Sequence, residues 1–290
     1  MPGHTHDDVD WAARLTSLRR LDDLERDALV EVARRLTDGL PHGPTVVDVG
    51  CGAGGMSLAL ADALRRAGGG TLILVDAVDE VLAAASQSVA AAGDSLVRVE
   101  AVLADVGADQ VREVITEADL IWAASVLHHV PDQQAAVNRL AGVLRPGGLL
   151  AVAEGGLAPR CLPWDIGIGR PGLEERLNGA RESWFEGLRA GMPDVARMPY
   201  GWTCALRRAG LSDLRSFSYL VDHPAPADSA VLDFVLDRFA WYSEIATDHV
   251  SEQDREAVRR LLDPDSPDYL GQRDDVYLLA ARTVHTGRRV

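Results

Sequence analysis

The sequence contains no lysine, because all 29 of its basic residues are arginine. It therefore cannot supply the lysine of a pyridoxal-phosphate Schiff base, of a nucleotide-binding P-loop or of a protein-kinase strand. Three large enzyme classes are excluded on this ground alone. Alanine, arginine and glycine are abundant, so we attribute the missing lysine to codon usage of GC-rich DNA.

Positive charge is also in short supply. The chain has 290 residues, and 29 Lys+Arg against 44 Asp+Glu give a formal net charge of −15 at pH 7. Affinity for nucleic acids comes mainly from cations that neutralise phosphates. We therefore expect no nucleic-acid partner, and expect a small molecule or a discrete protein instead.

Cysteines and long apolar runs are scarce as well. Cys51, Cys161 and Cys204 are odd in number and widely spaced, which predicts neither a disulfide framework nor a metal site. His4 and His6 near the N-terminus have no further ligands beside them to complete a metal shell. The N-terminus is polar, and no run of about 18 apolar residues follows. We expect a cytoplasmic protein with no membrane association.

The spacing of apolar residues predicts an N-terminal helical segment over residues 1–40, followed by an alternation of short apolar runs with helical stretches. Strands that are apolar on both faces and alternate with helices predict a doubly wound, mostly parallel α/β sheet. We expect strands at 45–49, 71–75, 96–103, 120–124 and 149–153, and helices at 9–36, 56–67, 78–92, 108–116 and 133–144.

Two interruptions break this alternation within a domain predicted to span residues 41–290. The first follows Glu154, and the second, over 228–262, is helical by pattern. A helix at 202–209 and strands at 214–220 and 276–283 belong to the sheet domain again. Insertions at the loop end of such a sheet commonly cover the ligand. We therefore expect helical lid insertions at about 157–200 and 227–270.

A glycine-rich turn follows the first predicted strand and opens a helix. Its sequence, Asp48-Val49-Gly50-Cys51-Gly52-Ala53-Gly54-Gly55, allows a tight turn whose backbone N–H groups approach a nucleotide-like ligand. The turn satisfies both GxGxxG, the dinucleotide fingerprint, and DxGxGxG. Taken alone, it leaves the ligand open.

Further polar residues follow the later strands. Asp76 closes the second strand, where a carboxylate can accept hydrogen bonds from both ribose hydroxyls. Asp105 follows the third strand, and Leu127-His128-His129-Val130-Pro131-Asp132 follows the fourth. The segment Leu144-Arg145-Pro146-Gly147-Gly148 is predicted to be a turn that leads into the fifth strand.

This ordered set of motifs, over residues 45–155, resembles the class I S-adenosylmethionine-dependent methyltransferases. The resemblance implies a seven-stranded sheet whose last strand is antiparallel, and S-adenosylmethionine as the cofactor. It also implies cofactor contacts by position. Asp48, Gly50, Gly52 and Gly54 would lie near the methionine part, with Cys51 in the same turn, Asp76 on the ribose, and Asp105 with Val106 at the adenine.

Methyl transfer from a sulfonium requires alignment of the acceptor and exclusion of water. A general base helps a hydroxyl or an amine, but a carboxylate needs none. His128 and His129 at the end of the fourth strand are the candidate catalytic residues. The alternative is that they serve only as a loop and helix cap.

Candidate acceptor contacts lie further along the chain. Glu154 ends the fifth predicted strand, and Trp164, Tyr200 and Trp241 fall in the predicted lid segments. Each has a simpler interpretation, as a solvated strand end for Glu154 and as lid core for the aromatic residues. Arginines of the lid segments could hold an acceptor carboxylate by a bidentate pair.

The sequence predicts methylation of a small or medium-sized organic acceptor in secondary metabolism, on oxygen ahead of nitrogen or carbon. One alternative is carboxylate methylation of a peptide or acid. Others are an S-adenosylmethionine-binding protein without methyl transfer and an NAD-dependent oxidoreductase. A homodimer is possible.

Overall fold

The computed structural model describes residues 14–93, 96–108, 111–115, 117–245 and 249–290. The chain divides into two compact units. The first consists of Met1–Gly156, Met192–Tyr219 and Arg282–Val290, and the second of Leu157–Gly191 and Leu220–Ala281. The second unit overlaps both segments that were predicted as insertions. His4 and His6 fall outside the described residues.

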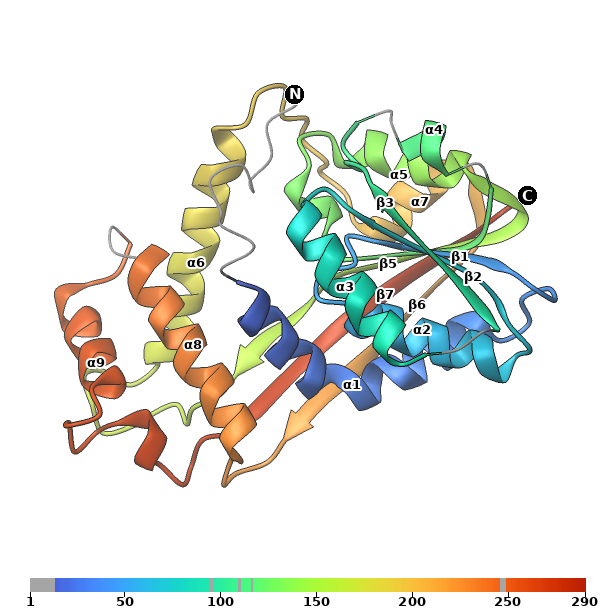
Figure 1. Cartoon of the computed structure of the whole chain (residues 1–290). Coiled ribbons are helices and arrows are strands. Elements are labelled where there is room, and N and C mark those ends of the chain that lie inside the picture. Colours follow the sequence, from blue (N-terminus) through green and yellow to red (C-terminus); the bar gives the residue numbers. More distant parts are fainter. Residues whose placement is uncertain (1–13, 94–95, 109–110, 116, 246–248) are drawn as a thin grey trace. The chain divides into compact units, whose positions relative to one another are not determined.

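A seven-stranded sheet has the strand order β3-β2-β1-β4-β5-β7-β6 (Figure 1). Neighbouring strands from β3 to β5 pair in parallel, whereas the arrow of β7 runs against those of β5 and β6 (Figure 1). The predicted fold class is therefore confirmed. The strands are β1 (Thr45–Val49), β2 (Gly70–Asp76), β3 (Val97–Leu103), β4 (Ala118–Ala124), β5 (Leu144–Arg160), β6 (Leu211–His223) and β7 (Leu278–Arg289).

Helices connect these strands, and among the described residues none is long and apolar enough to cross a membrane. Two short 3₁₀ turns lie at Leu127–His129 and Leu270–Gln272. The helices are α1 (Leu15–Thr37), α2 (Gly55–Arg66), α3 (Asp79–Ala91), α4 (Val111–Val114), α5 (Gln133–Gly142), α6 (Leu173–Ala190), α7 (Trp202–Arg208), α8 (Ser229–Ile245) and α9 (Glu252–Leu262).

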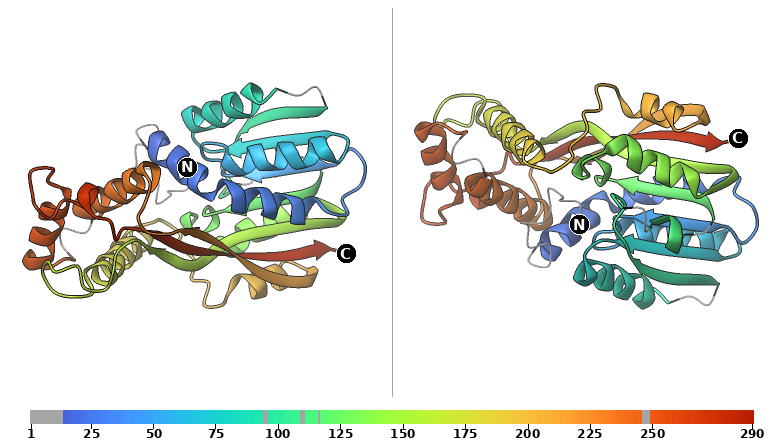
Figure 2. Two further views of the ribbon diagram at one scale, coloured as in Figure 1. Left: turned by 90° about the horizontal axis from the view of Figure 1, so that it is seen from below. Right: turned by 90° about the horizontal axis from the view of Figure 1, so that it is seen from above.

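The first unit has an apolar core on each face of its sheet. Successive residues of a strand point to opposite faces, so Val46 joins one core and Val47 the other. Helices α1, α2 and α3 cover the Val46 face, and α5 and α7 cover the Val47 face (Figure 2). The strand order reverses between β1 and β4, where doubly wound sheets bind their ligands at the carboxyl ends of the strands.

The predicted turn at residues 144–148 is wrong, because these residues are the first part of β5. Ala118 pairs with Leu144 and Leu120 with Leu149, so two steps along β4 face five along β5. This irregularity accommodates the proline and glycines that favour a turn locally. Pairing with β4 also ends α5 at Gly142, two residues before the predicted end.

Other observed bounds of strands and helices also differ from the predicted ones. β5 continues through Gly155-Gly156 to Arg160, so Glu154 lies within the strand rather than at its end. The helical region predicted at 228–262 is two helices, α8 and α9. The helix predicted at 108–116 is described only as the single turn α4, and part of its range lies outside the described residues. The same is true of residues 9–13, which precede α1.

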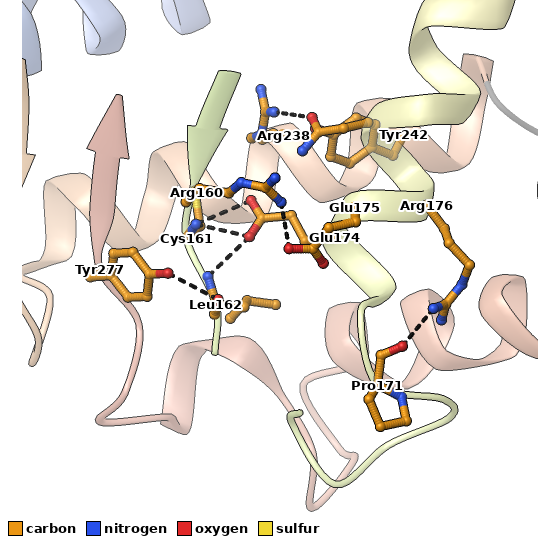
Figure 3. Close-up of polar contacts among 11 residues, drawn as sticks. Arg160, Cys161, Leu162, Pro171, Glu174, Glu175, Arg176, Arg238, Tyr242 and Tyr277 are labelled. Atoms are coloured by element: carbon orange, nitrogen blue, oxygen red, sulfur yellow. Dashed lines mark hydrogen bonds and ion pairs between the residues drawn. The ribbon is translucent and has the colours of Figure 1, made fainter. Parts of the chain in front are cut away.

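The second unit has its own buried polar network (Figure 3). The Glu174 carboxylate, near the start of α6, accepts hydrogen bonds from the backbone N–H of Cys161 at 3.0 Å and of Leu162 at 3.2 Å. Burial raises the pKa of this carboxyl. On the next turn of α6, Asn178 Oδ1 accepts a hydrogen bond from Arg238 Nη2 of α8 at 2.8 Å. These contacts join the end of β5 to two helices of the unit.

Candidate active site

The glycine turn joins β1 to α2, and its glycines differ in the space around them. Gly50 has a φ of +67°, and a Cβ atom there would lie 2.0 Å from Cγ2 of Val126. Gly52 has a φ of +57°, but a Cβ atom there would meet no atom within 4 Å. The turn is therefore closed against the loop after β4 and open above Gly52.

Two carboxylates flank this turn at the ends of β2 and β3. Asp76 accepts hydrogen bonds from the backbone N–H of Gly52 at 3.2 Å and of Val78 at 3.1 Å. Asp105 accepts one from Gly107 N at 2.6 Å. A carboxylate has about four acceptor positions, so Asp76 can still accept from the hydroxyls of a ligand.

A cavity of about 240 Å³ opens beside the glycine turn, and it gathers residues from β1, β2, β4 and α1. All of the residues that the sequence predicted for the cofactor line it, except Gly54, and His129 lines it as well. Gly54 instead lies against α3, where a Cβ atom would approach Ala85 Cα to 3.1 Å. The predicted residues that line the cavity are Asp48, Gly50, Cys51, Gly52, Asp76, Asp105, Val106 and His129.

One face of α1 forms another wall of the cavity, which the sequence analysis missed. Leu18, Leu21, Asp22, Glu25 and Leu29 recur at helical spacing and all line it. The signal was present in the sequence, because two acidic residues interrupt an otherwise apolar stripe of this helix. Such residues are seldom buried unless they have a partner or a function.

Two carboxyl groups of the cavity lining, Asp22 and Asp48, have raised pKa values. Asp22 accepts a hydrogen bond from Gly55 N at 2.9 Å, and Ser57 Oγ donates to Asp48 at 2.5 Å. Burial is the largest cause that raises the pKa of each to about 7, and the two groups repel each other when ionised. The cavity therefore favours a ligand that brings positive charge.

A second cluster lies on the same wall and joins α1 to the C-terminal strands. Glu25 Oε1 accepts from Arg282 Nε at 3.2 Å and from Arg282 Nη2 at 3.0 Å. The Tyr219 hydroxyl donates to Glu25 Oε2 at 3.4 Å. All three residues line the cavity, although they lie far apart in the sequence.

Glu154 organises the loop that carries the two histidines. Its side chain is buried, and Oε1 accepts from the backbone N–H of Val126 at 2.9 Å and of Leu127 at 2.7 Å. Oε2 lies 2.6 Å from Nδ1 of His128, whose ring lies 3.9 Å from that of His129. The solvated strand end considered for Glu154 is therefore wrong.

The aromatic candidates for acceptor binding each have contacts within their own unit. Tyr200 donates a hydrogen bond to Gln134 Oε1 at 3.0 Å, and Arg208 stacks on its ring at 4.2 Å. Trp164 and Trp241 belong to the second unit. Trp164 is 68% exposed there, whereas Trp241 makes an edge contact with the ring of Trp184.

The family described as "Methyltransferase domain" matches residues 47–150. The 27-O-demethylrifamycin SV methyltransferase of Amycolatopsis mediterranei is 31% identical over 47% of this chain and 50% of its own length. The nocamycin O-methyltransferase of Saccharothrix syringae is 30% identical over 69% of this chain and 71% of its own length. The chain belongs to the S-adenosylmethionine-dependent methyltransferases.

The fold of this methyltransferase also resembles solved structures of the family. The crystal structure of a protein from Bacillus halodurans, described as a "putative methyltransferase", matches this fold with a TM-score of 0.51 at 16% identity, over 92% of this chain and 98% of the other. The methyltransferase spans about half the length of three curated relatives that it matches. Membership of the family decides against a nicotinamide oxidoreductase as the interpretation of the glycine turn.

The cavity of the methyltransferase has the chemistry that its cofactor requires. S-adenosylmethionine carries a sulfonium and an ammonium group, and the half-buried Asp22 and the buried Asp48 favour positive charge. Cys51 lines the cavity, but burial raises the pKa of its thiol. A protonated thiol is a poor nucleophile, so Cys51 contributes shape rather than reactivity.

Proposed function

We propose that this methyltransferase transfers a methyl group from S-adenosylmethionine to a hydroxyl oxygen of a small or medium-sized organic acceptor in secondary metabolism. Two of the relatives, a nocamycin O-methyltransferase and a 27-O-demethylrifamycin SV methyltransferase, carry names that refer to oxygen positions. The observation that carries the proposal is the 2.6 Å contact between His128 Nδ1 and Glu154 Oε2.

The cofactor contacts follow from the cavity. In this proposal Asp76 accepts hydrogen bonds from the ribose hydroxyls, and the turn at Gly50 and Gly52 with Asp48 faces the methionine part. Asp105 and Val106 bind the adenine. Support comes from their common position on the cavity lining. When bound, S-adenosylmethionine supplies an electrophilic methyl group on a sulfonium centre.

His128 is the proposed general base. In this proposal the Glu154 carboxylate accepts a hydrogen bond from the proton on His128 Nδ1, which assigns the lone pair to Nε2. Nε2 can then take the hydroxyl proton while Glu154 stabilises the resulting imidazolium. His129, on the cavity wall, is the second candidate.

The acceptor itself is proposed to be a small molecule rather than a peptide. Tyr200 of the first unit remains a proposed acceptor contact, because an aromatic side chain offers a large apolar surface to an organic ligand. Glu154 is reassigned from acceptor binding to positioning of His128, since its two oxygens already hold the loop.

A screen of hydroxylated small molecules with isotopically labelled S-adenosylmethionine tests the proposal. We expect label transfer to a hydroxyl, and loss of turnover in His128→Ala with unchanged S-adenosylhomocysteine binding. Full turnover in both His128→Ala and His129→Ala would contradict a general base and would favour carboxylate methylation. Thermal stabilisation by NADH but not by S-adenosylhomocysteine would overturn the function as a whole.

A further inference from the structure

The cluster of Glu25, Arg282 and Tyr219 has no place in the proposed transfer step, yet it lies on the cavity wall. The Glu25 side chain is 10% exposed and that of Arg282 is 26% exposed. The three residues come from α1, β7 and β6. Burying an ion pair costs the desolvation energy of both charged groups. A pair placed beside a ligand cavity can offset this cost by binding the ligand.

The charges of the cavity set Arg282 apart. Among the described residues that line it, five are carboxylates, namely Asp22, Glu25, Asp48, Asp76 and Asp105. Arg282 is the permanent cation of that same described lining. Because the chain has no lysine, Arg282 is the permanent cation that a carboxylate entering this cavity would meet, beside the side-chain donors Ser125, His129 and Tyr219 and backbone N–H groups.

The ion pair retains capacity to bind a ligand. A guanidinium has five N–H donors, and Glu25 Oε1 takes one from Nε and one from Nη2 of Arg282. Glu25 Oε2 accepts at 3.4 Å from the Tyr219 hydroxyl, a long contact for an O–H donor. Arg282 can therefore donate to a second carboxylate while Glu25 Oε2 accepts from an ammonium group.

An ion pair of this kind is complementary to a zwitterion, and an α-amino acid group is one. We propose that Glu25 and Arg282 bind the amino-acid end of S-adenosylmethionine, with its α-carboxylate on Arg282 and its ammonium on Glu25. The inference rests on the proposed function, because it assigns this end of the cofactor to one wall of the same cavity. The long contact from Tyr219 leaves Glu25 Oε2 available to that ammonium.

The assignment also explains why α1 belongs to the site. Glu25 is one turn beyond Asp22 on the same face of α1, and both line the cavity. Arg282 holds that face through Glu25. The amino-acid end of the cofactor would therefore contact an N-terminal helix and a C-terminal strand together.

Two natural ligands separate this role from a purely structural one. S-adenosylhomocysteine carries the amino-acid end, whereas 5′-methylthioadenosine shares the adenosine and the thioether but lacks that end. We would measure the Kd of both by titration calorimetry for the wild type, Arg282→Gln, Glu25→Gln and Tyr219→Phe. Arg145→Gln is the matched control, because Arg145 forms ion pairs with Glu117 and Asp119 outside the cavity.

We expect Arg282→Gln to weaken S-adenosylhomocysteine binding about 10-fold or more, as for loss of a charged hydrogen-bonded pair, and to change the Kd of 5′-methylthioadenosine less than about twofold. Equal weakening of both ligands would overturn the proposal and leave a structural clasp for α1. An unchanged preference for S-adenosylhomocysteine would also overturn it.

Arg282→Lys keeps the charge and serves if Arg282→Gln does not fold. Arg282→Lys should raise the Kd of S-adenosylhomocysteine but not that of 5′-methylthioadenosine, because an ammonium lacks the planar fork of a guanidinium. Equal binding of S-adenosylhomocysteine by Arg282→Lys and the wild type would overturn the assignment. If the wild type binds neither ligand, the proposed function itself fails, which is a different result from loss of discrimination.

Discussion

Nδ1 of His128 lies 2.6 Å from Oε2 of Glu154, and the other oxygen of the same carboxylate accepts two backbone N–H groups of the loop that carries His128. Glu154 therefore fixes both the loop and the orientation of the imidazole. Since β5 pairs with β4 up to Ala153, the carboxylate directly follows a hydrogen-bonded part of the sheet.

Glu154→Gln should lower kcat about 10-fold to 100-fold without weakening the binding of S-adenosylhomocysteine. The glutamine Oε1 can still accept from the loop N–H groups, but its NH₂ group donates toward His128 Nδ1. The imidazole proton then moves to Nε2, so the base is lost.

Two measurements would check this prediction: kcat for the acceptor as a function of pH, and the Kd of S-adenosylhomocysteine by titration. Glu117→Gln, at an exposed carboxylate, is the control. If Glu154 acts through His128, Glu154→Gln should add little to the loss in His128→Ala. Additive losses in the double variant would show that the two residues act independently.

Asp76→Ala should abolish the thermal shift produced by S-adenosylhomocysteine. The substitution removes the proposed ribose acceptor and the acceptor for Gly52 N and Val78 N. Each lost hydrogen bond costs about 1 kcal/mol of stability, so the variant should still fold. Asp79→Ala, at the start of α3, is the control. A wild-type thermal shift in Asp76→Ala would refute the ribose assignment.

Affinity for S-adenosylmethionine should rise as the pH increases from 6 to 8. The pKa values of Asp22 and Asp48 are raised to about 7 in the free protein, so ionisation over this range prepares the cavity for a cation. For one such group the gain is at most about 10-fold. Calorimetry in buffers of different ionisation enthalpy would detect the accompanying proton release. A flat Kd over this range would contradict the prediction, and 5′-methylthioadenosine, which is uncharged, is the control ligand.

Asp22→Asn should stabilise the free protein at pH 8 but not at pH 4. The pKa of Asp22 is raised in the folded state from 3.8 to about 7, so its contribution to stability is greatest below about pH 4 and is lost as the pH rises through 7. Asparagine keeps an acceptor for Gly55 N.

We expect a gain of roughly 1–2 kcal/mol in the free energy of unfolding at pH 8, measured by urea titration at both pH values. Asp23→Asn, at the exposed neighbour of Asp22, controls for the change in net charge. A larger gain at pH 4 than at pH 8 would show that the sign is wrong.

Gly50→Ala and Gly52→Ala should differ in stability although both glycines have positive φ. A Cβ atom at Gly50 would lie 2.0 Å from Val126, whereas one at Gly52 meets nothing within 4 Å. Gly52→Ala carries only the backbone penalty of about 1–2 kcal/mol, and Gly50→Ala adds a steric clash. Thermal denaturation of both should give the lower Tm for Gly50→Ala. Equal Tm values would mean that the loop at Val126 moves aside freely.

The parallel sheet could be predicted because its information is local. Each central strand is apolar on both faces. The glycine turn follows β1, Asp76 is the last residue of β2, and Asp105 lies two residues after β3. Residues at the carboxyl ends of adjacent parallel strands are neighbours whatever else the chain does. The cavity lining of Asp48, Gly50, Gly52, Asp76 and Asp105 was therefore accessible from the sequence.

Errors arose where pairing between strands overruled a local preference. Residues 144–148 contain proline and glycine, yet they belong to β5, whose pairing with β4 begins at Leu144 and resumes at Leu149. Glu154 appeared to end a strand before Gly155, yet the strand continues and buries it. No property of a short segment reveals that a partner strand will hold it.

The sequence by itself determined the family, the order of the sheet motifs and the absence of lysine that leaves arginine as the fixed cation. Only the tertiary structure decided that Glu25, Tyr219 and Arg282 meet on one wall of the cavity. Their separation along the chain is too large for any periodicity to relate them. The contact exists because α1 packs on the face of the sheet toward which Tyr219 of β6 and Arg282 of β7 point. Long-range packing, which a linear pattern does not encode, brought that ion pair to the cofactor cavity.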